Sequence, residues 1–345
     1  MTASVPYLTH ERELTEPVNL CLPDGKLNPE AVGWSRRPVQ RCNLSGSWGR
    51  KKRWDFWCMT SPECALQFTY ANLDYFGLAS VALTDFETHR FVEHAAIVPF
   101  GSGFKQPEKV GGWDISFDRM GLKLNVREEK NGTRFGATFR NIKRETLEAD
   151  VFIEYPKNHE TLSVVIPWSD SRFQFTSKHN TLPASGYVKA KGRRYEFAQN
   201  SYGCLDYGRG LWPYKTVWNW GSASGTSDEK TVGLQLGGKW TDGTGMTENA
   251  LCVDGRLHKL GEDLVWEYDR KDLKNPWRIT APKTRRVDLT FRPLLTRSLK
   301  LPLLVAGAEL HMGFGHFSGT VLTDERKPVH VEKLLGWAEE FTGRW

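Results

Sequence analysis

The chain has 345 residues and a formal net charge of +6, with 39% hydrophobic and 26% charged residues. This composition is ordinary for a soluble globular protein, and no apolar run approaches the roughly 18 residues of a membrane-spanning helix. A single hydrophobic core usually stops growing at roughly 250–300 residues, so the length predicts two lobes. The N-terminus has no basic segment leading into an apolar one, so we expect no secretory signal and a cytoplasmic protein.

Most of the chain alternates apolar and polar residues with a period of two, which predicts half-buried antiparallel strands. In the first half, strands are predicted at residues 65–71, 78–86, 91–98, 113–117, 122–127, 134–140, 148–155 and 162–166. The second half is predicted to have strands at residues 186–191, 193–198, 216–221, 231–237, 249–253, 256–260, 264–268, 277–280, 287–291, 308–314 and 316–322. Only a short stretch near residues 331–341 is predicted to be helical.

The strand pattern breaks near residues 169–183. Ser, Asp, Asn, Thr and Pro cluster there, so we expect the boundary between the lobes near residues 170–185, although a strand could cross between the lobes. So many strands must close on themselves or pack face to face, because open sheet edges promote aggregation. The sequence therefore predicts an all-β fold of two antiparallel barrel or half-barrel lobes with few short helices. Residues 1–40 would form an N-terminal extension packing on the barrels, residues 41–175 the N-terminal lobe and residues 185–345 the C-terminal lobe.

The sequence gives little support for a metal site, a cofactor site or a nucleic-acid-binding site. The six cysteines include no Cys-x-x-Cys pair, and the spaced histidines would lie on opposite faces of a strand, so we expect free thiols and no metal site. Glycine pairs occur without a following helix, so we expect no nucleotide or other cofactor. The basic run Arg50–Arg53 lies among aromatic residues, as in single-strand binders, but acidic residues are spread along the chain, so we expect no nucleic-acid partner.

One stretch combines charge with many aromatic rings: Gly203-Cys-Leu-Asp-Tyr-Gly-Arg-Gly-Leu-Trp-Pro-Tyr214, followed by Trp218-Asn-Trp220. A carboxyl group among indoles is poorly solvated, which raises its pKa and lets it donate a proton at neutral pH. Asp206 is therefore the first candidate for a catalytic acid, and Tyr207 is a candidate proton acceptor. Arg209 also belongs to this group, although it would instead form a structural ion pair if it faces Asp206.

Glu248 supplies a second candidate carboxylate, which would act as acid, base or nucleophile, or else simply accept hydrogen bonds in a turn. The chain has 14 tryptophans, and indole faces suit sugar rings, apolar polyenes or cationic centres. The candidate substrate-binding residues are Trp212, Tyr214, Trp218, Trp220, Asn249, Asp74 and Tyr75.

Seven stretches carry recognisable motifs: Gly33–Pro38, Cys42–Leu44 with Arg50–Trp54, Leu73–Tyr75, Thr84–Thr88, Asp206–Tyr214, Thr247–Ala250 with Asp254-Gly255, and Gly315–Gly319. Together, in this order and spacing, they resemble the domain-of-unknown-function family 2804. More remotely, Leu205-Asp-Tyr-x-Arg-Gly210, the paired tryptophans and Glu248-Asn-Ala250 are similar to motifs of the lipocalin-like carotenoid hydratase and AttH-like group. This resemblance implies two lipocalin-like, calycin-type lobes and hydratase-type chemistry.

Three classes of function remain open. The preferred one is an enzyme that uses a buried carboxylic acid for hydration, elimination, isomerisation or cyclisation of a hydrophobic or isoprenoid-like substrate. The second is a glycan-active enzyme in which Asp206 and Glu248 form the carboxylate pair. The third is a lipocalin-like protein that binds an apolar or sugar ligand without chemistry. In each case the expected partner is a small molecule, with no integral membrane segment.

Overall fold

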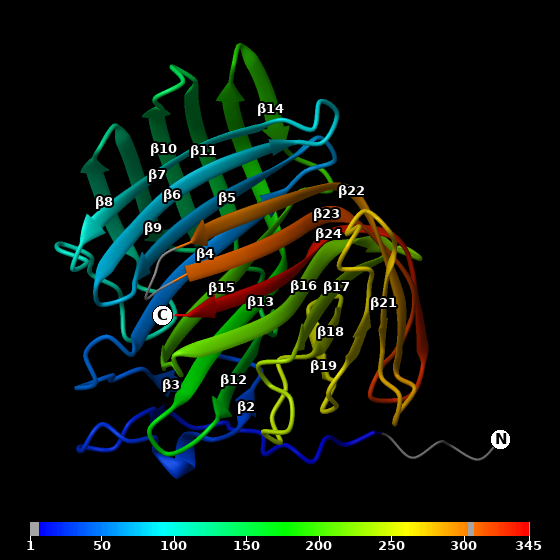
Figure 1. The fold of residues 1–345 in the computed structure, drawn as a ribbon. Helices are drawn as coiled ribbons and strands as arrows, with labels where there is room; N and C mark the ends of the chain where they lie inside the picture. The colour runs from blue at the N-terminus through cyan, green and yellow to red at the C-terminus, as the bar shows by residue number, and fades with distance from the viewer. Residues whose placement is uncertain (1–6, 303–306, 345) are drawn as a thin grey trace.

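The computed structural model describes residues 7–302 and 307–344. Apart from one short 3₁₀ helix (Pro29–Ala31), all regular elements in these residues are β-strands (Figure 1). They form two large antiparallel sheets and a small sheet of β1 (Val18–Asn19) and β3 (Gln40–Arg41). None of the helices described is long and apolar enough to cross a membrane.

The first sheet curls into a nearly closed barrel. Its main path is β7 (Phe91–Pro99), β6 (Phe76–Asp85), β5 (Cys64–Asn72), β4 (Lys51–Thr60), β15 (Tyr202–Leu211), β13 (Phe173–Ala190), β11 (Thr146–Glu154), β10 (Gly132–Arg140), β9 (Leu122–Glu129) and β8 (Asp114–Arg119). β12 (Leu162–Pro167) and β14 (Arg193–Phe197) pair with β13, and β2 (Trp34–Ser35) pairs with β12. The two ends of this path approach each other, since Nε2 of His94 on β7 lies 2.6 Å from the Met120 carbonyl oxygen.

The second sheet is a strongly curved half-barrel. Its order is β19 (Arg256–Lys259), β18 (Ala250–Val253), β17 (Lys230–Gly238), β16 (Lys215–Ser227), β24 (Pro328–Arg344), β23 (Gly307–Leu322), β22 (Val287–Pro302), β21 (Trp277–Thr280) and β20 (Val265–Glu267). Each sheet encloses its own hydrophobic core, as the alternation of apolar residues requires. The prediction of an all-β fold with barrel and half-barrel lobes is therefore confirmed.

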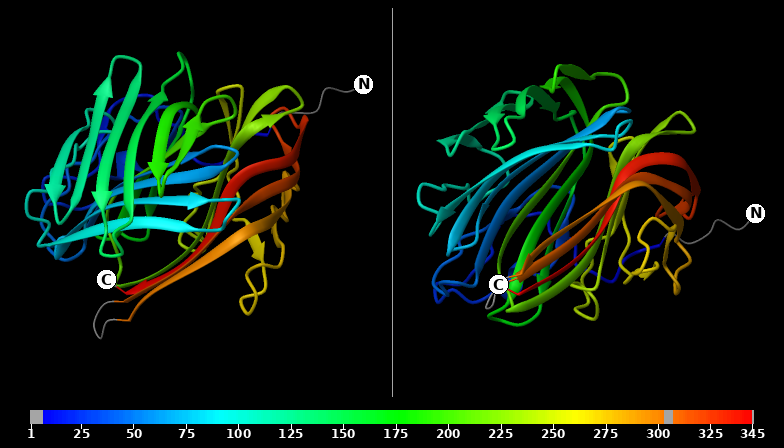
Figure 2. Two further views of the ribbon diagram at one scale, coloured as in Figure 1. Left: turned by 90° about the horizontal axis from the view of Figure 1, so that it is seen from above. Right: turned by 45° about the horizontal axis from the view of Figure 1, so that its top comes forward.

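The two sheets pack against each other, so that β22, β23, β24 and β16 run below β4 to β7 in Figure 1 and alongside them in Figure 2. Two smaller hydrophobic clusters fill the interface, one around Trp212 and Trp240 and the other around Trp220 and Trp337. The N-terminal segment runs along the base of both lobes (Figure 1). Trp34 pairs with β12 of the first sheet, and buried Glu11 accepts hydrogen bonds from Thr247 of the second lobe.

The structure corrects three local expectations. Residues 331–341 are not helical, because they lie within β24, which is hydrogen-bonded to β16 on one side and β23 on the other. Residues 173–183 are not a break, because they form the first part of the long strand β13. The division between the two large sheets falls between Leu211 and Lys215, whereas the sequence places a lobe boundary inside β13.

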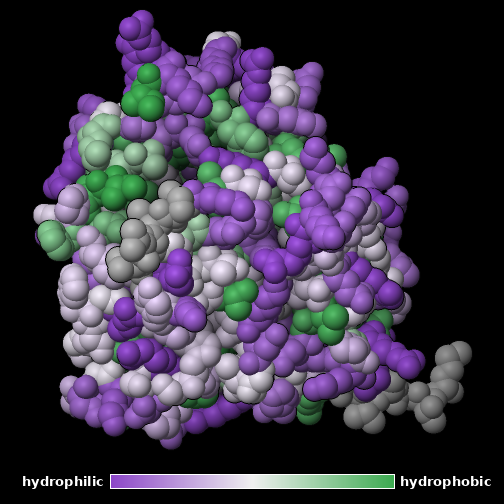
Figure 3. Space-filling model, in the orientation of Figure 1, coloured by the Kyte–Doolittle hydropathy of each residue, from purple (hydrophilic) through white to green (hydrophobic). Residues whose placement is uncertain are grey.

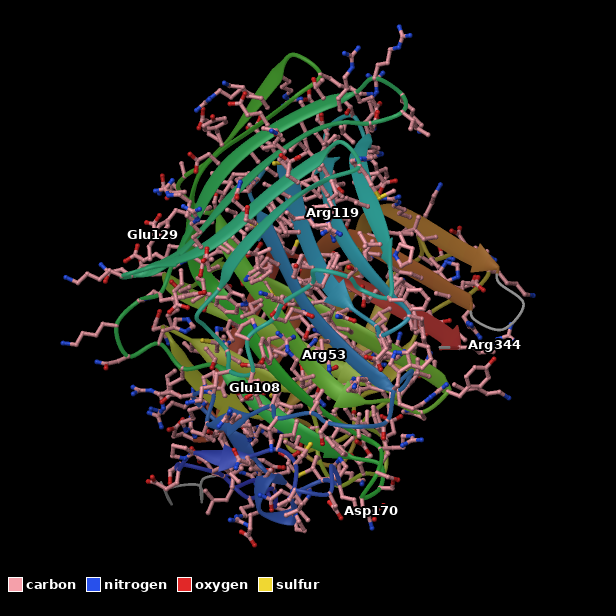
Figure 4. The ribbon with its side chains drawn as sticks, turned by 90° about the vertical axis from the view of Figure 1, so that its left-hand side faces the viewer. Arg53, Glu108, Arg119, Glu129, Asp170 and Arg344 are labelled. Carbon is pink, nitrogen blue, oxygen red and sulfur yellow. The ribbon has the colours of Figure 1, made fainter. Side chains whose placement is uncertain are left out.

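The basic run at residues 50–53 leads into β4, a strand shared between the barrel and the interface. Lys52 is fully buried, and burial lowers its pKa to about 7. Arg53, labelled in Figure 4, forms an ion pair with Asp74, with 3.5 Å between Nη1 and Oδ1. Lys52 is thus held inside the protein, whereas Arg53 is half-buried and paired.

Candidate active site

A cavity of about 380 Å³ lies between the two sheets. The first sheet contributes side chains from β4, β5, β6, β7, β13 and β15, and the second contributes side chains from β16, β22, β23 and β24. Trp240 and Glu248, on the segment between β17 and β18, complete the lining. Most of the lining is apolar or aromatic, but it includes six ionisable side chains. Four of them form an acid cluster, Lys178, Asp206, Glu248 and Glu339, and the other two, Glu93 and Arg297, pair with each other.

The Gly-rich motif of β15 forms one wall of this cavity. Residues 206, 208, 210 and 212 share a strand face, and the two glycines leave room for large side chains from neighbouring strands. A Cβ atom on Gly208 would lie 2.1 Å from Cε2 of Trp54, and one on Gly210 would lie 2.2 Å from Oε1 of Gln174. Trp54 can therefore lie over Gly208 and donate its indole N–H to Oδ2 of Asp206 at 3.1 Å.

Lys178 lies at the centre of the charged cluster. It stands directly opposite Asp206 across β13 and β15, and its Nζ is 2.9 Å from Oδ2 of Asp206 and 3.4 Å from Oε2 of Glu248. The same ammonium lies 3.9 Å from the ring centroid of Trp220. Burial alone would lower the pKa of Lys178, but the charges of Asp206 and Glu248 outweigh it and raise that pKa. Lys178 is therefore a cation that holds two carboxylates together.

Each carboxylate of the cluster also accepts a hydrogen bond from an indole. Trp54 donates to Asp206, Trp240 donates to Oε1 of Glu248 at 2.6 Å, and Trp218 donates to Oε1 of Glu339 at 2.8 Å. Asp206 accepts a further bond from the Thr176 hydroxyl at 3.2 Å. The tryptophans thus do two things at once: their rings form the cavity wall and their N–H groups fix the carboxylates.

Two of the three carboxyl groups titrate near neutrality. Burial is the main cause that raises the pKa of Glu248 to about 7, and the nearby charge of Asp206 adds to it. Burial likewise raises the pKa of Glu339 to about 7, and the charges of Asp206 and Glu248 add to this increase. The charge of Lys178 and the indole hydrogen bonds act in the opposite direction. A carboxyl group with such a pKa can donate or accept a proton at physiological pH.

The cavity brings together five of the residues singled out from the sequence: Asp206, Glu248, Trp212, Trp218 and Trp220. They come from β15, β16 and the segment before β18, so their meeting depends on the packing of the two sheets.

Tyr207 and Arg209 point to the opposite face of β15, into the barrel. The Tyr207 hydroxyl donates to the Pro107 carbonyl at 2.9 Å, and Nη2 of Arg209 lies 3.0 Å from both carboxylate oxygens of Asp55. Arg209 therefore forms its buried ion pair with Asp55 and not with Asp206.

The other four expected binding residues lie outside the cavity lining. Tyr214 is 42% exposed, and its ring lies beside the Arg50 guanidinium. Asn249 is fully buried and hydrogen-bonds the backbone at Gly237 and Glu262.

Asp74 and Tyr75 belong to the turn between β5 and β6, where Asp74 has a positive φ of 73°. The Asp74 carboxylate accepts a hydrogen bond from Gly49 N at 2.7 Å, and the Tyr75 hydroxyl contacts Nζ of Lys52.

Sequence reasoning missed Lys178 and Glu339, as well as the indoles of Trp54 and Trp240. Lys178 lies in the segment taken for a break, and Glu339 lies in the segment taken for a helix. The alternation of side chains along a strand could have revealed both residues. Thr176 and Lys178 share one strand face, and Trp337, Glu339 and Phe341 share another. An acid placed between two aromatic residues on a strand face is the pattern that marks this site.

Across residues 7–302 and 307–344, no group of three or more His, Cys, Asp or Glu side chains is placed to hold a metal ion. The six cysteines are all free and buried, and burial raises the pKa of Cys204 to about 12, so this thiol stays protonated at neutral pH.

The chain is similar to three solved structures at low sequence identity. Kievitone hydratase from Nectria haematococca matches with a TM-score of 0.50 and 11% identity, over 86% of this chain and 89% of that one. A putative AttH from Nitrosomonas europaea matches with a TM-score of 0.48 and 14% identity, over 84% of this chain and 92% of that one. CghA with Sch210972 matches with a TM-score of 0.45 and 10% identity, over 90% of this chain and 89% of that one.

At such identities the kievitone hydratase likeness shows a common lipocalin-like fold and no more. No curated protein sequence matches the chain. The model of a domain of unknown function, DUF2804, matches residues 11–345, and the chain therefore belongs to the DUF2804 family.

Proposed function

We propose that the protein is an enzyme that performs acid–base chemistry on an apolar substrate in the cavity, with Glu339 as the proton donor. One observation carries this proposal: Glu339 is a carboxyl group in a largely apolar cavity whose pKa is raised to about 7. Within the part of the chain that the structure describes, Glu339 has no ion-pair partner, and Trp218 occupies only its Oε1 atom. Its second oxygen is thus available to a substrate.

The other two carboxylates are less suited to this role. Asp206 accepts bonds from Lys178, Trp54 and Thr176, so both of its oxygens are already occupied by donors from the protein. Glu248 is 1% exposed, and its Oε2 faces Lys178. In this proposal Asp206 is a positioning residue that holds Lys178 and Trp54, and Glu248, whose Oε2 lies 3.4 Å from Nζ of Lys178, is the proton acceptor.

Hydration of a carbon–carbon double bond is the reaction that we derive for this arrangement. The Glu339 O–H bond breaks as its proton forms a new C–H bond with one alkene carbon, and the π electrons leave the other carbon cationic. A water molecule then supplies an electron pair to form the C–O bond and passes its excess proton to Glu248. Exchange of protons with solvent restores the two glutamates, and the reverse sequence is elimination of water.

The surroundings suit the cationic intermediate of this reaction. Once Glu339 has given up its proton, the cluster carries more negative than positive charge, because Lys178 is its single cation among the four ionisable residues. Indole faces of Trp212, Trp218 and Trp220 line the same space and stabilise positive charge through their ring quadrupoles. The name of the similar structure, kievitone hydratase, supports hydration as the first reaction to test.

The geometry gives less support to glycoside hydrolysis by Asp206 and Glu248. A glycosidase leaves an open space between its two carboxyl groups for the glycosidic bond. Here the Lys178 ammonium fills that space, because it lies within 3.4 Å of both carboxylates.

The test begins with the ligand that the purified protein retains. This ligand is extracted, identified by mass spectrometry and returned to the protein in ¹⁸O-labelled water. We expect a product that has gained one labelled water molecule, and a loss of rate of roughly 10²–10⁴-fold in Glu339→Gln. Glu332→Gln, an exposed position on the same strand, serves as the control. An unchanged ligand with both proteins would instead identify a binding protein.

A further inference from the structure

Two cross-strand rows of side chains line the cavity. On the first sheet, paired positions of β13, β15, β4, β5 and β6 give the row Lys178, Asp206, Phe56, Thr69 and Ser80. On the second sheet, paired positions of β16, β24, β23 and β22 give the row Trp220, Glu339, Met312 and Arg297.

Contacts between the sheets show that these rows run in the same direction. The Lys178 ammonium lies over Trp220, and the rings of Phe56 and Trp220 are 5.9 Å apart. Further along, Nε2 of Gln67 on β5 lies 3.6 Å from Sδ of Met312 on β23. The acid cluster therefore occupies one end of the cavity, and Thr69 and Ser80 occupy the other end.

The register fixes the distance between the two ends. Neighbouring strands lie about 4.8 Å apart, so Thr69, two strands from Asp206, is about 10 Å from Asp206 along the sheet, and Ser80, three strands away, is about 14 Å from it. Phe56, between them, offers an apolar surface to the middle of a ligand.

Thr69 and Ser80 are polar positions in an apolar wall. They stand directly opposite each other on β5 and β6, both line the cavity, and both are half-buried. In residues 7–302 and 307–344, neither hydroxyl has a hydrogen-bond partner in the protein. Ala71, Leu78, Ala82 and Gln67 line the same wall of the cavity. A few convergent polar groups in an apolar pocket are the usual means of fixing the orientation of a ligand.

We infer that the substrate is an oxygenated apolar molecule, with a hydroxyl or carbonyl oxygen bound by Thr69 and Ser80, two and three strands away from Asp206 of the acid cluster. The oxygen is neutral, because Arg297, which lines the cavity from the second sheet, is already paired with Glu93. A carboxylate or phosphate would be opposed by the Glu93 charge. The inference rests on the proposed function, which identifies the acid cluster as the reacting end.

Binding of two matched probes tests the inference without turnover. 1-Decanol and 1-chlorodecane have the same apolar chain, but only the alcohol forms two strong hydrogen bonds. Quenching of the tryptophan fluorescence of the full-length protein gives a Kd for each probe. We expect tighter binding of 1-decanol, and a loss of its affinity by roughly 5–20-fold in Thr69→Val with Ser80→Ala, with little change for 1-chlorodecane.

A control variant, Ser116→Ala with Thr138→Val, removes the same two hydroxyl types from exposed strands of the barrel. It should keep the wild-type affinities for both probes, and thermal unfolding of both double variants verifies that they are folded. Equal affinities of the wild type for the two probes, no saturable binding of 1-decanol, or an unchanged alcohol preference in Thr69→Val with Ser80→Ala would overturn the inference. None of these results depends on whether Glu339 transfers a proton, so the binding experiment tests the inference independently of the proposed function.

Discussion

Lys178 and Asp206 face each other across strands β13 and β15, and the 2.9 Å contact between Nζ and Oδ2 is buried between the two sheets of the protein. Glu248 and Glu339 line the same cavity. The Lys178 ammonium is paired with Asp206 and Glu248, and its charge also lowers the pKa of Glu339. Such an excess of buried acid costs stability, because carboxylates lose their hydration without full compensation. The site therefore has the character of a functional centre held in place by its surroundings.

Removal of the central cation should destabilise the protein in a pH-dependent manner. In Lys178→Met, the carboxylates remain without a counter-ion, and we expect a loss of roughly 3–5 kcal/mol in the free energy of unfolding at pH 8. At pH 6 the loss should be smaller, because without Lys178 the pKa values of Glu248 and Glu339 rise further and both groups take up protons. Denaturant unfolding at the two pH values measures the difference.

Lys189→Met provides the control for this variant, since Lys189 lies on the same strand but is exposed and paired with Glu148. Its free energy of unfolding should stay within about 0.5 kcal/mol of the wild type at both pH values. An equal loss in Lys178→Met at pH 6 and pH 8 would show that the lysine acts through packing alone.

Glu339→Gln should stabilise the folded protein at high pH. The folded-state pKa of Glu339 is raised from 4.5 to about 7, so the folded state binds its proton more tightly than the unfolded state does. Between these values wild-type stability falls as the pH rises, because the unfolded chain ionises first. Glutamine keeps the Trp218 hydrogen bond and never ionises.

We therefore expect Glu339→Gln to be more stable than the wild type above pH 7, by at most about 3 kcal/mol, and equally stable near pH 4. The measurement is the free energy of unfolding from pH 4 to pH 8, in a salt concentration held constant. A variant that is less stable than the wild type at pH 8 would mean that the Glu339 charge is compensated in the folded state.

The main architecture could be predicted from the sequence because strand alternation is a local signal. Segments such as β9 (Leu122–Glu129) alternate buried and exposed residues along their length. The acid Asp206 and the indoles of β15 and β16 could also be found, because they lie within one short motif.

The rest of the site depends on contacts that no local pattern encodes. In residues 331–341 the apolar side chains of Leu334, Leu335, Ala338 and Phe341 have the spacing of a helix. Hydrogen bonding to β16 and β23 on both sides overrides that local preference and turns Glu339 into the cavity. Lys178 was hidden for a similar reason, because β13 runs through a polar segment whose side chains are buried only when the two sheets pack.

Gly208→Ala should disturb the cavity wall. The added Cβ would lie 2.1 Å from Cε2 of Trp54 and 2.6 Å from Nε2 of Gln174, so the indole must move away from Asp206. We expect a loss of about 1–3 kcal/mol in the free energy of unfolding and a changed near-ultraviolet circular dichroism spectrum. Gly136→Ala is the matched control on a strand of the barrel, because its nearest atom would lie 4.0 Å away. Equal effects of the two substitutions would contradict a packing role for Gly208.

The hydrogen bond between Trp218 and Glu339 should set the titration of that carboxyl group. Because this bond stabilises the ionised form, it lowers the pKa of Glu339, and its loss in Trp218→Phe should raise that pKa above about 7, by roughly one unit. In the wild type the ring of Trp218 stacks on that of Phe341, with 3.7 Å between the ring centroids. Phenylalanine at position 218 keeps a ring against Phe341, so the cavity wall is preserved. Carbon-13 spectra of side-chain-labelled glutamate follow the titration directly. The control is Trp240→Phe, which should raise the pKa of Glu248 instead, since Trp240 donates to that carboxyl group. If the pKa of Glu339 moved equally in both variants, burial and not the Trp218 hydrogen bond would control that pKa.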